Sequence, residues 1–189
     1  MPNNKLIILS GLPGSGKSTY CERITQERAA QGKRSVVISS DEIRKKFLGK
    51  YDDLHNEKFV WNLFNALIYD HRMEDDMTVI LDATFLTNKK RYNYANRFKK
   101  WYNEVELVVM QIPIETCFIQ NEQRPKIKWV PKDVILSMDN TFDPVDFTTC
   151  WDYFTSVVLV KPEGEIKLER ENYNDTIRVI KKLWPSNEN

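Results

Sequence analysis

The sequence has little of several features that would point to particular classes of protein. Its 189 residues include only three cysteines, Cys21, Cys117 and Cys150. Because they are odd in number and far apart, they form neither a disulfide framework nor the paired spacing of a metal site. The two histidines, His55 and His71, lie in no pattern typical of an acid–base pair. We therefore expect reduced thiols that act as packing groups, as is usual in the cytoplasm.

Long hydrophobic runs and an excess of one charge are also missing. No apolar stretch approaches the length of a membrane span, and residues 1–4 lack the layout of a signal peptide. The net charge is +1, so any signal for nucleic-acid binding must be local. No repeat, low-complexity tract or linker divides the chain. We expect a cytoplasmic protein with no membrane segment, folded as a single domain over residues 1–189 with ample length for a buried core.

Glycine is scarce too, yet three of the six glycines lie close together in residues 11–19, GLPGSGKST. This stretch fits the phosphate-binding loop pattern G-x-x-x-x-G-K-[ST] at every fixed position. An apolar run of strand length precedes it and a helical pattern follows it, so the loop leads into a helix N-terminus, which favours a phosphate. The pattern predicts an ATP site with Mg²⁺, in which Lys17 reaches the phosphates and Ser18 ligates the metal. The predicted nucleotide-binding residues are Gly11, Pro13, Gly14, Ser15, Gly16, Lys17, Ser18 and Thr19.

Apolar strand-like runs alternate with helical patterns along the chain. Most of these runs are apolar on both faces, which suits a mostly parallel sheet covered by helices on both sides. The sequence therefore predicts a three-layer α/β fold with a sheet of five strands. The expected strands are residues 6–9, 35–39, 78–82, 105–112 and 156–160. The expected helices are residues 19–28, 41–48, 55–71, 88–102, 115–123, 131–138 and 172–184, with stops at Gly49 and Pro185.

A second candidate site follows the second expected strand. Asp41 would face the same cleft as the phosphate loop, because ligands of open α/β sheets bind beyond the carboxyl ends of the strands. A carboxylate there can act as general base toward an attacking hydroxyl. Arg44, three residues on, shares a helix face with Asp41, and its guanidinium suits an anionic group of the acceptor. The alternative is a purely structural role, in which Ser40 or Asp41 caps a helix.

A third candidate is the apolar strand that ends in Asp82, where a carboxylate can be held near Mg²⁺. Thr84, two residues on, is a candidate for substrate binding. Arg91, in the next helical pattern, is either a further substrate contact or part of a solvated basic helix face.

The fourth candidate is a basic segment between two helical patterns, which we interpret as a lid over about residues 121–130. Phosphoryl transfer needs a cation near the developing charge of the γ-phosphate, and Arg124 is the candidate for this catalytic role. Lys126 and Lys128 are either helpers or ordinary exposed lysines. Trp129 could stack on a base.

Together these stretches resemble the kinase domain of phage polynucleotide kinase and its relatives, within the P-loop kinase group that also contains zeta-type toxins. The segments that carry the resemblance are GLPGSGKST, SSDEIR, DATFLTNKKR and NEQRPKIKWVPKDVILSM, which span roughly residues 5–138. The resemblance implies a P-loop kinase fold, with Asp41 as general base, Arg44 on a phosphate of the acceptor and Arg124 as the lid arginine. The Arg124–Val130 segment is one residue longer than is usual in the family, and Phe85 stands where relatives often have Asn.

These observations predict an ATP- and Mg²⁺-dependent kinase whose acceptor is a hydroxyl, and they favour the 5′-OH of DNA or RNA. The local basic segments at residues 89–91, 97–100 and 126–132 fit a polyanion. A kinase for a hydroxymethylated base, a small metabolite or a sugar nucleotide is an alternative. A nucleotide-binding switch or ATPase is an alternative of another class. Oligomeric state is not predicted.

Overall fold

The strand that precedes the phosphate loop lies at the centre of the sheet. In the computed structural model, which describes residues 3–51 and 54–170, β1 (Lys5–Ser10) pairs in parallel with β3 (Met77–Asp82) on one side and β4 (Glu104–Met110) on the other. The β1 side chains from Leu6 to Leu9 are buried on both faces of the sheet. This explains why β1 is a continuous apolar run rather than an alternating one.

The sheet has six strands in the order β2-β3-β1-β4-β5-β6, and only the last pair is antiparallel. All five predicted strands are confirmed, and the sixth was not predicted. It alternates charged and apolar residues in the sequence GEIKLE, so it lacks the continuous apolar pattern of its neighbours. Only Leu168 of this edge strand is buried. The remaining strands are β2 (Arg34–Ser39), β5 (Ser156–Lys161) and β6 (Gly164–Glu169).

Helices cover both faces of the sheet, as the sequence predicts. The predicted helices up to residue 138 are all present with small shifts of their ends, and α2 stops at Gly49, whose φ is 87°. The predicted helix over residues 172–184 lies outside the described residues. The α-helices are α1 (Lys17–Ala30), α2 (Ser40–Leu48), α3 (Glu57–Asp70), α4 (Asn88–Phe98), α5 (Ile114–Gln123) and α6 (Lys132–Asp139). Short 3₁₀ turns are η1 (His71–Met73), η2 (Lys126–Lys128) and η3 (Cys150–Asp152).

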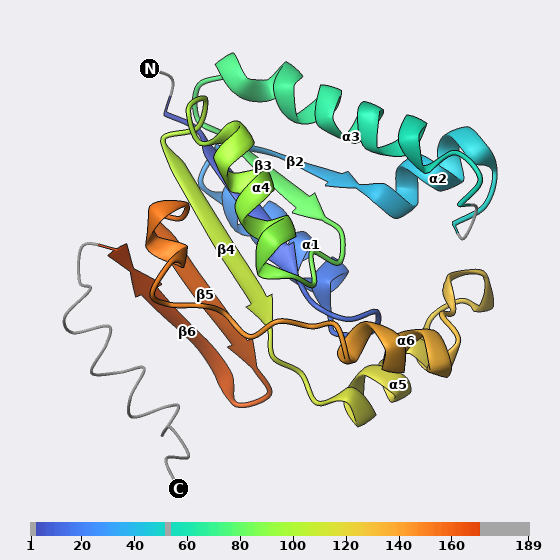
Figure 1. Cartoon of the computed structure of the whole chain (residues 1–189). Helices are drawn as coiled ribbons and strands as arrows, with labels where there is room; N and C mark the ends of the chain where they lie inside the picture. The colour runs from blue at the N-terminus through green and yellow to red at the C-terminus, as the bar shows by residue number, and fades with distance from the viewer. Residues whose placement is uncertain (1–2, 52–53, 171–189) are drawn as a thin grey trace, which may run out of the picture.

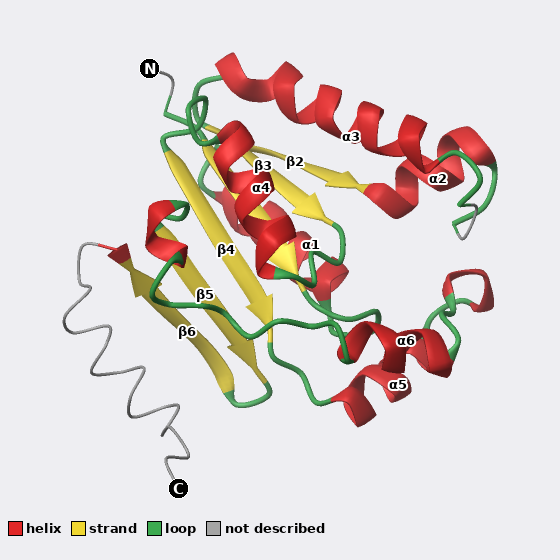
Figure 2. Cartoon of the chain, viewed as in Figure 1, coloured by secondary structure: helices red, strands yellow, loops and turns green. Residues whose placement is uncertain are grey.

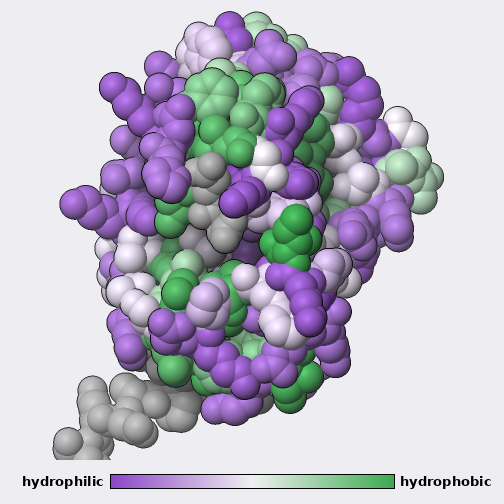
Figure 3. Space-filling view, turned by 90° about the vertical axis from the view of Figure 1, so that its right-hand side faces the viewer, coloured by the Kyte–Doolittle hydropathy of each residue, from purple (hydrophilic) through white to green (hydrophobic). Residues whose placement is uncertain are grey.

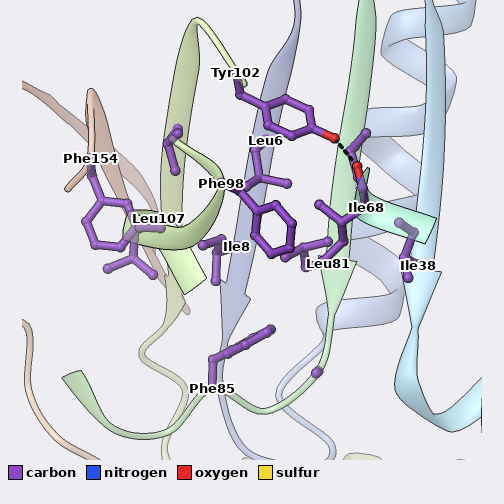
Figure 4. Packing of buried hydrophobic residues seen from close by; sticks show 14 of the residues in the cluster. Leu6, Ile8, Ile38, Ile68, Leu81, Phe85, Phe98, Tyr102, Leu107 and Phe154 are labelled. Atoms are coloured by element: carbon purple, nitrogen blue, oxygen red, sulfur yellow. Dashed lines mark hydrogen bonds between the residues drawn. The ribbon is translucent and has the colours of Figure 1, made fainter. Parts of the chain in front are cut away.

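Two apolar layers hold the helices to the sheet. Helices α3 and α4 lie on one face and α1 lies behind the other (Figure 1). Alternate β1 residues divide between these layers, so Leu6 packs toward Phe64 and Phe98 while Ile7 packs toward α1. In the larger layer the Tyr102 hydroxyl donates a 2.7 Å hydrogen bond to the Ile68 carbonyl (Figure 4), which satisfies the one polar atom that the ring brings into the core. The three cysteines are free and buried, in agreement with a packing role.

The carboxyl ends of the parallel strands meet at one edge of the sheet. There Ser39 at the end of β2 is the register partner of Asp82 at the end of β3. The loop after β1 joins them, because the Gly11 N–H donates a 3.0 Å hydrogen bond to the Thr84 carbonyl. Helices α5 and α6 lie at the same edge, where loops connect them to the sheet (Figure 2). None of the helices described here has the length and apolar character that a membrane crossing requires.

Candidate active site

The phosphate loop has a backbone that only its glycines allow. Gly14 and Gly16 have φ values of 78° and 90°, which L side chains rarely adopt. A Cβ atom on Gly14 would lie 2.2 Å from the carbonyl oxygen of Cys117. The loop therefore packs directly against α5, and a side chain at residue 14 would push the two segments apart.

The N-terminus of α1 suits an anion. Its N-cap residue, Gly16, has no side chain to cap the first turn, and that turn contains no acidic residue. By contrast, Ser39 and Thr87 cap α2 and α4 with their hydroxyls. The Ser15 hydroxyl in the loop is also buried and has no hydrogen-bond partner among the described residues. Backbone N–H groups and the helix dipole at such an end favour a phosphate, so the loop fits the phosphates of a nucleotide.

Lys17 lies inside this loop. Its Nζ donates hydrogen bonds to the carbonyl oxygens of Gly11 (2.9 Å) and Leu12 (2.7 Å). Burial lowers the pKa of Lys17, and the negative charges of Asp82 and Asp41 oppose that shift. The two loop carbonyls therefore hold the ammonium group, and the charges of the predicted metal ligand Asp82 and the predicted base Asp41 favour its protonated form.

The oxygen donors expected for Mg²⁺ lie together. Asp82 accepts a side-chain hydrogen bond from Ser18, and burial raises the pKa of Asp82 while Lys17 opposes the rise. No group of three or more His, Cys, Asp or Glu side chains in the described part of the chain could hold a metal ion. A hydroxyl and one carboxylate fit Mg²⁺, which usually keeps several waters and takes further oxygens from nucleotide phosphates. Ser18 and Asp82 would hold the ion.

The helix that carries Asp41 is capped by a residue other than the sequence predicts. The Ser39 hydroxyl, not that of Ser40 or the carboxylate of Asp41, accepts the N–H of Glu42 at 3.4 Å. The capping alternative for Asp41 is therefore wrong. The Asp41 side chain is 58% exposed and is held by Arg44 Nη1, which donates to its Oδ1 at 2.7 Å.

Arg44 is buried and its donors are largely occupied. Its Nε and Nη2 donate to the two carboxylate oxygens of Glu57 at 2.7 and 2.9 Å, and Nη1 donates to Asp41. The paired edge that the sequence analysis assigns to a phosphate of the acceptor faces Glu57 in this structure. Sequence reasoning missed Glu57, because no pattern links the first turn of α3 to a residue in the preceding helix.

The segment predicted as a lid contributes Arg124 and Lys128 to the lining of the site. Arg124 ends α5, and its carbonyl oxygen accepts the indole N–H of Trp129 at 2.7 Å, which folds the segment through η2 back on itself. Lys128 reaches across to α2, where its Nζ donates to Glu42 Oε1 at 2.9 Å and lies 4.6 Å from the centre of the Tyr51 ring. The Lys128–Glu42 contact was not predicted either.

One cavity of about 430 Å³ connects these groups. Residues predicted for the metal site, the general base and the lid line it together, although they come from four separate segments. The third predicted catalytic residue, Lys17, and the phosphate-loop residues before it are not among the lining residues. Its lining includes Ser18, Ser39, Asp41, Asp82, Arg124 and Lys128. The face that carries α2 and the lid is mostly hydrophilic, with smaller hydrophobic patches among the hydrophilic residues (Figure 3). Phe47, Phe59, Ile127 and Trp129 are the exposed apolar residues of α2, the start of α3 and the lid.

Arg91 does not reach this cavity. Its side chain is fully buried, and burial lowers its pKa to about 10. It donates to the carbonyl oxygens of Phe85, Leu86 and Asp143, to the Ser10 hydroxyl and to Asn88 Oδ1. The structure therefore gives Arg91 a structural role and does not support the predicted substrate contact. Thr84 lies beside the loop, joined to it through its carbonyl oxygen.

The sheet is mostly parallel, and the phosphate loop follows its central strand β1. A carboxylate at the end of β3 lies beside the loop serine, and a basic segment lines the same cavity. These features define a P-loop kinase domain. The chain belongs to the AAA_33 family, described as an AAA domain, whose family model matches residues 6–145.

Among curated proteins, the chain is 29% identical over 147 residues to an L-seryl-tRNA(Sec) kinase of Methanococcus maripaludis, which covers 78% of this chain. This chain spans only 56% of that relative's length. Among solved structures, it resembles a chain of the Pnkp1/Rnl/Hen1 RNA repair complex, with a TM-score of 0.63 and 21% identity over 75% of this chain and 45% of the other. It also resembles the APS kinase CysC of Mycobacterium tuberculosis in complex with AMPPNP and APS, with a TM-score of 0.60 and 13% identity, covering 96% and 99% of the two chains. At these identities the solved structures support the fold alone.

Proposed function

We propose that this protein is an ATP- and Mg²⁺-dependent kinase that transfers the γ-phosphate to the 5′-OH of DNA or RNA. The observation that carries the proposal is the single cavity in which Asp41 and Arg124 lie with the metal-site pair Ser18 and Asp82. A nucleotide switch or simple ATPase needs no hydroxyl-activating carboxylate beside the phosphate loop, whereas a kinase does.

Each residue has a task in this reaction. The loop amides and Lys17 bind and orient the phosphates, and Mg²⁺, when bound, neutralises developing charge on them. Asp41 accepts the proton of the attacking hydroxyl. Arg124, which lines the same cavity, supplies a positive charge from the lid. The lid lysines and the exposed Trp129 provide a basic and aromatic surface that suits a nucleic acid.

A second candidate has its own support. The similarity to an L-seryl-tRNA(Sec) kinase covers 78% of this chain, so the acceptor hydroxyl could instead belong to an amino acid esterified to tRNA. Both candidates place the acceptor on a nucleic acid, and they differ in which hydroxyl approaches Asp41.

The test is a transfer screen with γ-labelled ATP. The acceptors are a 5′-OH oligonucleotide as DNA and as RNA, seryl-tRNA, a duplex with hydroxymethylated bases, a sugar nucleotide and water. We expect label on the 5′-OH oligonucleotide and none with the Lys17→Ala variant. Label on seryl-tRNA alone would select the second candidate, and phosphate release to water alone would replace the kinase by an ATPase.

A further inference from the structure

We propose that Glu57 is a positioning residue that fixes the catalytic Asp41 through Arg44. The inference rests on the proposed function, because it assigns Asp41 the role of base. In this proposal Arg44 links the carboxylates of Asp41 and Glu57 instead of binding a phosphate of the acceptor.

Most hydrogen-bond donors of Arg44 are engaged within the protein. A guanidinium has five N–H groups. Nε–H and one Nη2–H point at Glu57, and one Nη1–H points at Asp41. The second Nη1–H faces the Ser40 hydroxyl at a long 3.5 Å. One N–H group remains, which is too few for the paired grip on a phosphate that makes arginine selective.

Glu57 is held by Trp61 as well as by Arg44. Its Oε2 also accepts the indole N–H of Trp61 at 2.9 Å, one helical turn further along α3. Trp61 in turn packs edge-on against Phe64, which is fully buried in the core, with ring centroids 5.2 Å apart. The Arg44 bonds lower the pKa of Glu57, so its carboxylate stays charged at neutral pH. The core therefore anchors Glu57, and Glu57 in turn orients Arg44.

The exposed fraction of the side chain decreases from Asp41 to Glu57 to Arg44. The Asp41 side chain is 58% exposed, Glu57 is 32% exposed and Arg44 is 10% exposed. An exposed carboxylate on the second residue of a helix has several rotamers, and among the described residues it is the Arg44 bond that restricts them. Arg44 itself is a long side chain that needs a second anchor, and the two-bond contact with Glu57 provides it.

Positioning of this kind affects the rate more than binding. A catalytic group displaced by about 1 Å can lose roughly 10²-fold in rate. We expect Glu57→Gln, which keeps the shape but weakens the charged pair, to lower kcat by roughly 10–100-fold with little change in KM for ATP. The matched control is Glu74→Gln, which breaks an Arg–Glu pair with Arg34 at the opposite end of the sheet and should leave kcat unchanged.

A double-mutant cycle tests whether Glu57 acts through Arg44. In an Arg44→Met background, Glu57→Gln should cause no further loss of kcat, because the link from Glu57 through Arg44 to Asp41 is already absent. An equal loss in both backgrounds would overturn the inference. Asp41→Asn serves as reference: if it leaves transfer intact, the proposed function fails, whereas full sensitivity to Asp41→Asn with none to Glu57→Gln defeats the positioning role alone.

Nuclear magnetic resonance gives a readout independent of transfer. In ¹⁵N-labelled protein the Arg44 Nε–H signal, assigned by its loss in Arg44→Met, should be protected from exchange with water. Glu57→Gln should shift this signal and speed its exchange, and Glu74→Gln should not. An unchanged Arg44 signal in Glu57→Gln would show that Glu57 does not hold the guanidinium.

Discussion

At the scale of single residues, Asp41 shares the cavity with Ser18 and Asp82 but has a different hydrogen-bond partner. It bonds to Arg44, whereas Lys17 and Ser18 engage the loop carbonyls and Asp82. We therefore predict that Asp41→Asn lowers kcat by about 10²–10⁴-fold, because an amide of the same size cannot accept a proton at neutral pH. Nucleotide affinity, measured by calorimetry, should stay within about twofold. A parallel loss of affinity would place Asp41 in the metal site instead.

Arg91 is the second residue for which the structure changes the expectation. It holds the turn after β3, where Phe85 has a φ of 39° that a bulky residue adopts only under constraint. Ser10 supports the same turn by donating to the Phe85 carbonyl at 2.8 Å. The family that this sequence resembles often has Asn in place of Phe85, and Asn adopts this conformation more easily than Phe. Arg91 thus contributes to the shape of the segment between Asp82 and α4.

We predict that Arg91→Met destabilises the fold without altering acceptor binding. Each buried carbonyl left without a donor costs about 1–3 kcal/mol. A loss of at least about 2 kcal/mol should lower Tm by roughly 4–8 °C in a chain of this length. The measurements are Tm by calorimetry and KM for the acceptor. A raised KM with an unchanged Tm would restore the substrate-binding role.

At the scale of elements, the sequence predicts what depends on local pattern. Strand β1 follows from an apolar run, and the phosphate loop follows from glycines at fixed spacing, a pattern that also leads into α1. The charged–apolar alternation of β6 is a weaker signal, because an edge strand buries only one of its faces. Contacts between elements, such as Arg44–Glu57 and Lys128–Glu42, depend on how α3 and the lid are placed, and neither placement has a local signature.

The lid contact supplies a prediction at this scale. Lys128→Ala releases η2 from α2, so we expect kcat/KM to fall about 1.4- to fivefold, which corresponds to the roughly 0.2–1 kcal/mol typical of an exposed ion pair. Tm should hardly change. Lys132→Ala is the control, because Lys132 pairs with Glu122 between α6 and α5 without reaching α2. Exchange of the charges, Lys128→Glu with Glu42→Lys, should restore activity if the contact acts as a latch. Failure of the exchanged pair, with a loss that grows with oligonucleotide length, would assign Lys128 to phosphate binding.

At the scale of the whole molecule, the site joins segments that are far apart in the sequence. The loop after β1, the ends of β2 and β3 and the lid meet at the carboxyl edge of the sheet. This convergence is the part of the site that the fold class predicts, because parallel strands bring their carboxyl ends together. The lid is attached to α2 by Lys128 and packs on the phosphate loop at Gly14.

A ligand at this edge should therefore stabilise the entire domain. Binding at 100 times Kd contributes about 2.7 kcal/mol, which corresponds to a rise in Tm of roughly 5–11 °C for a chain of this size. We predict such a rise with ATP and Mg²⁺, and a smaller one when EDTA is added, because EDTA removes the Mg²⁺ that Ser18 and Asp82 would hold. Lys17→Ala should remove most of the shift while keeping the Tm of the ligand-free protein, since the Lys17 ammonium bonds only to carbonyls of its own loop. Scanning calorimetry of both proteins over a series of ATP concentrations makes the comparison. A Tm that stays constant up to millimolar ATP would show that the loop does not bind a nucleotide, and the kinase assignment would fall with it.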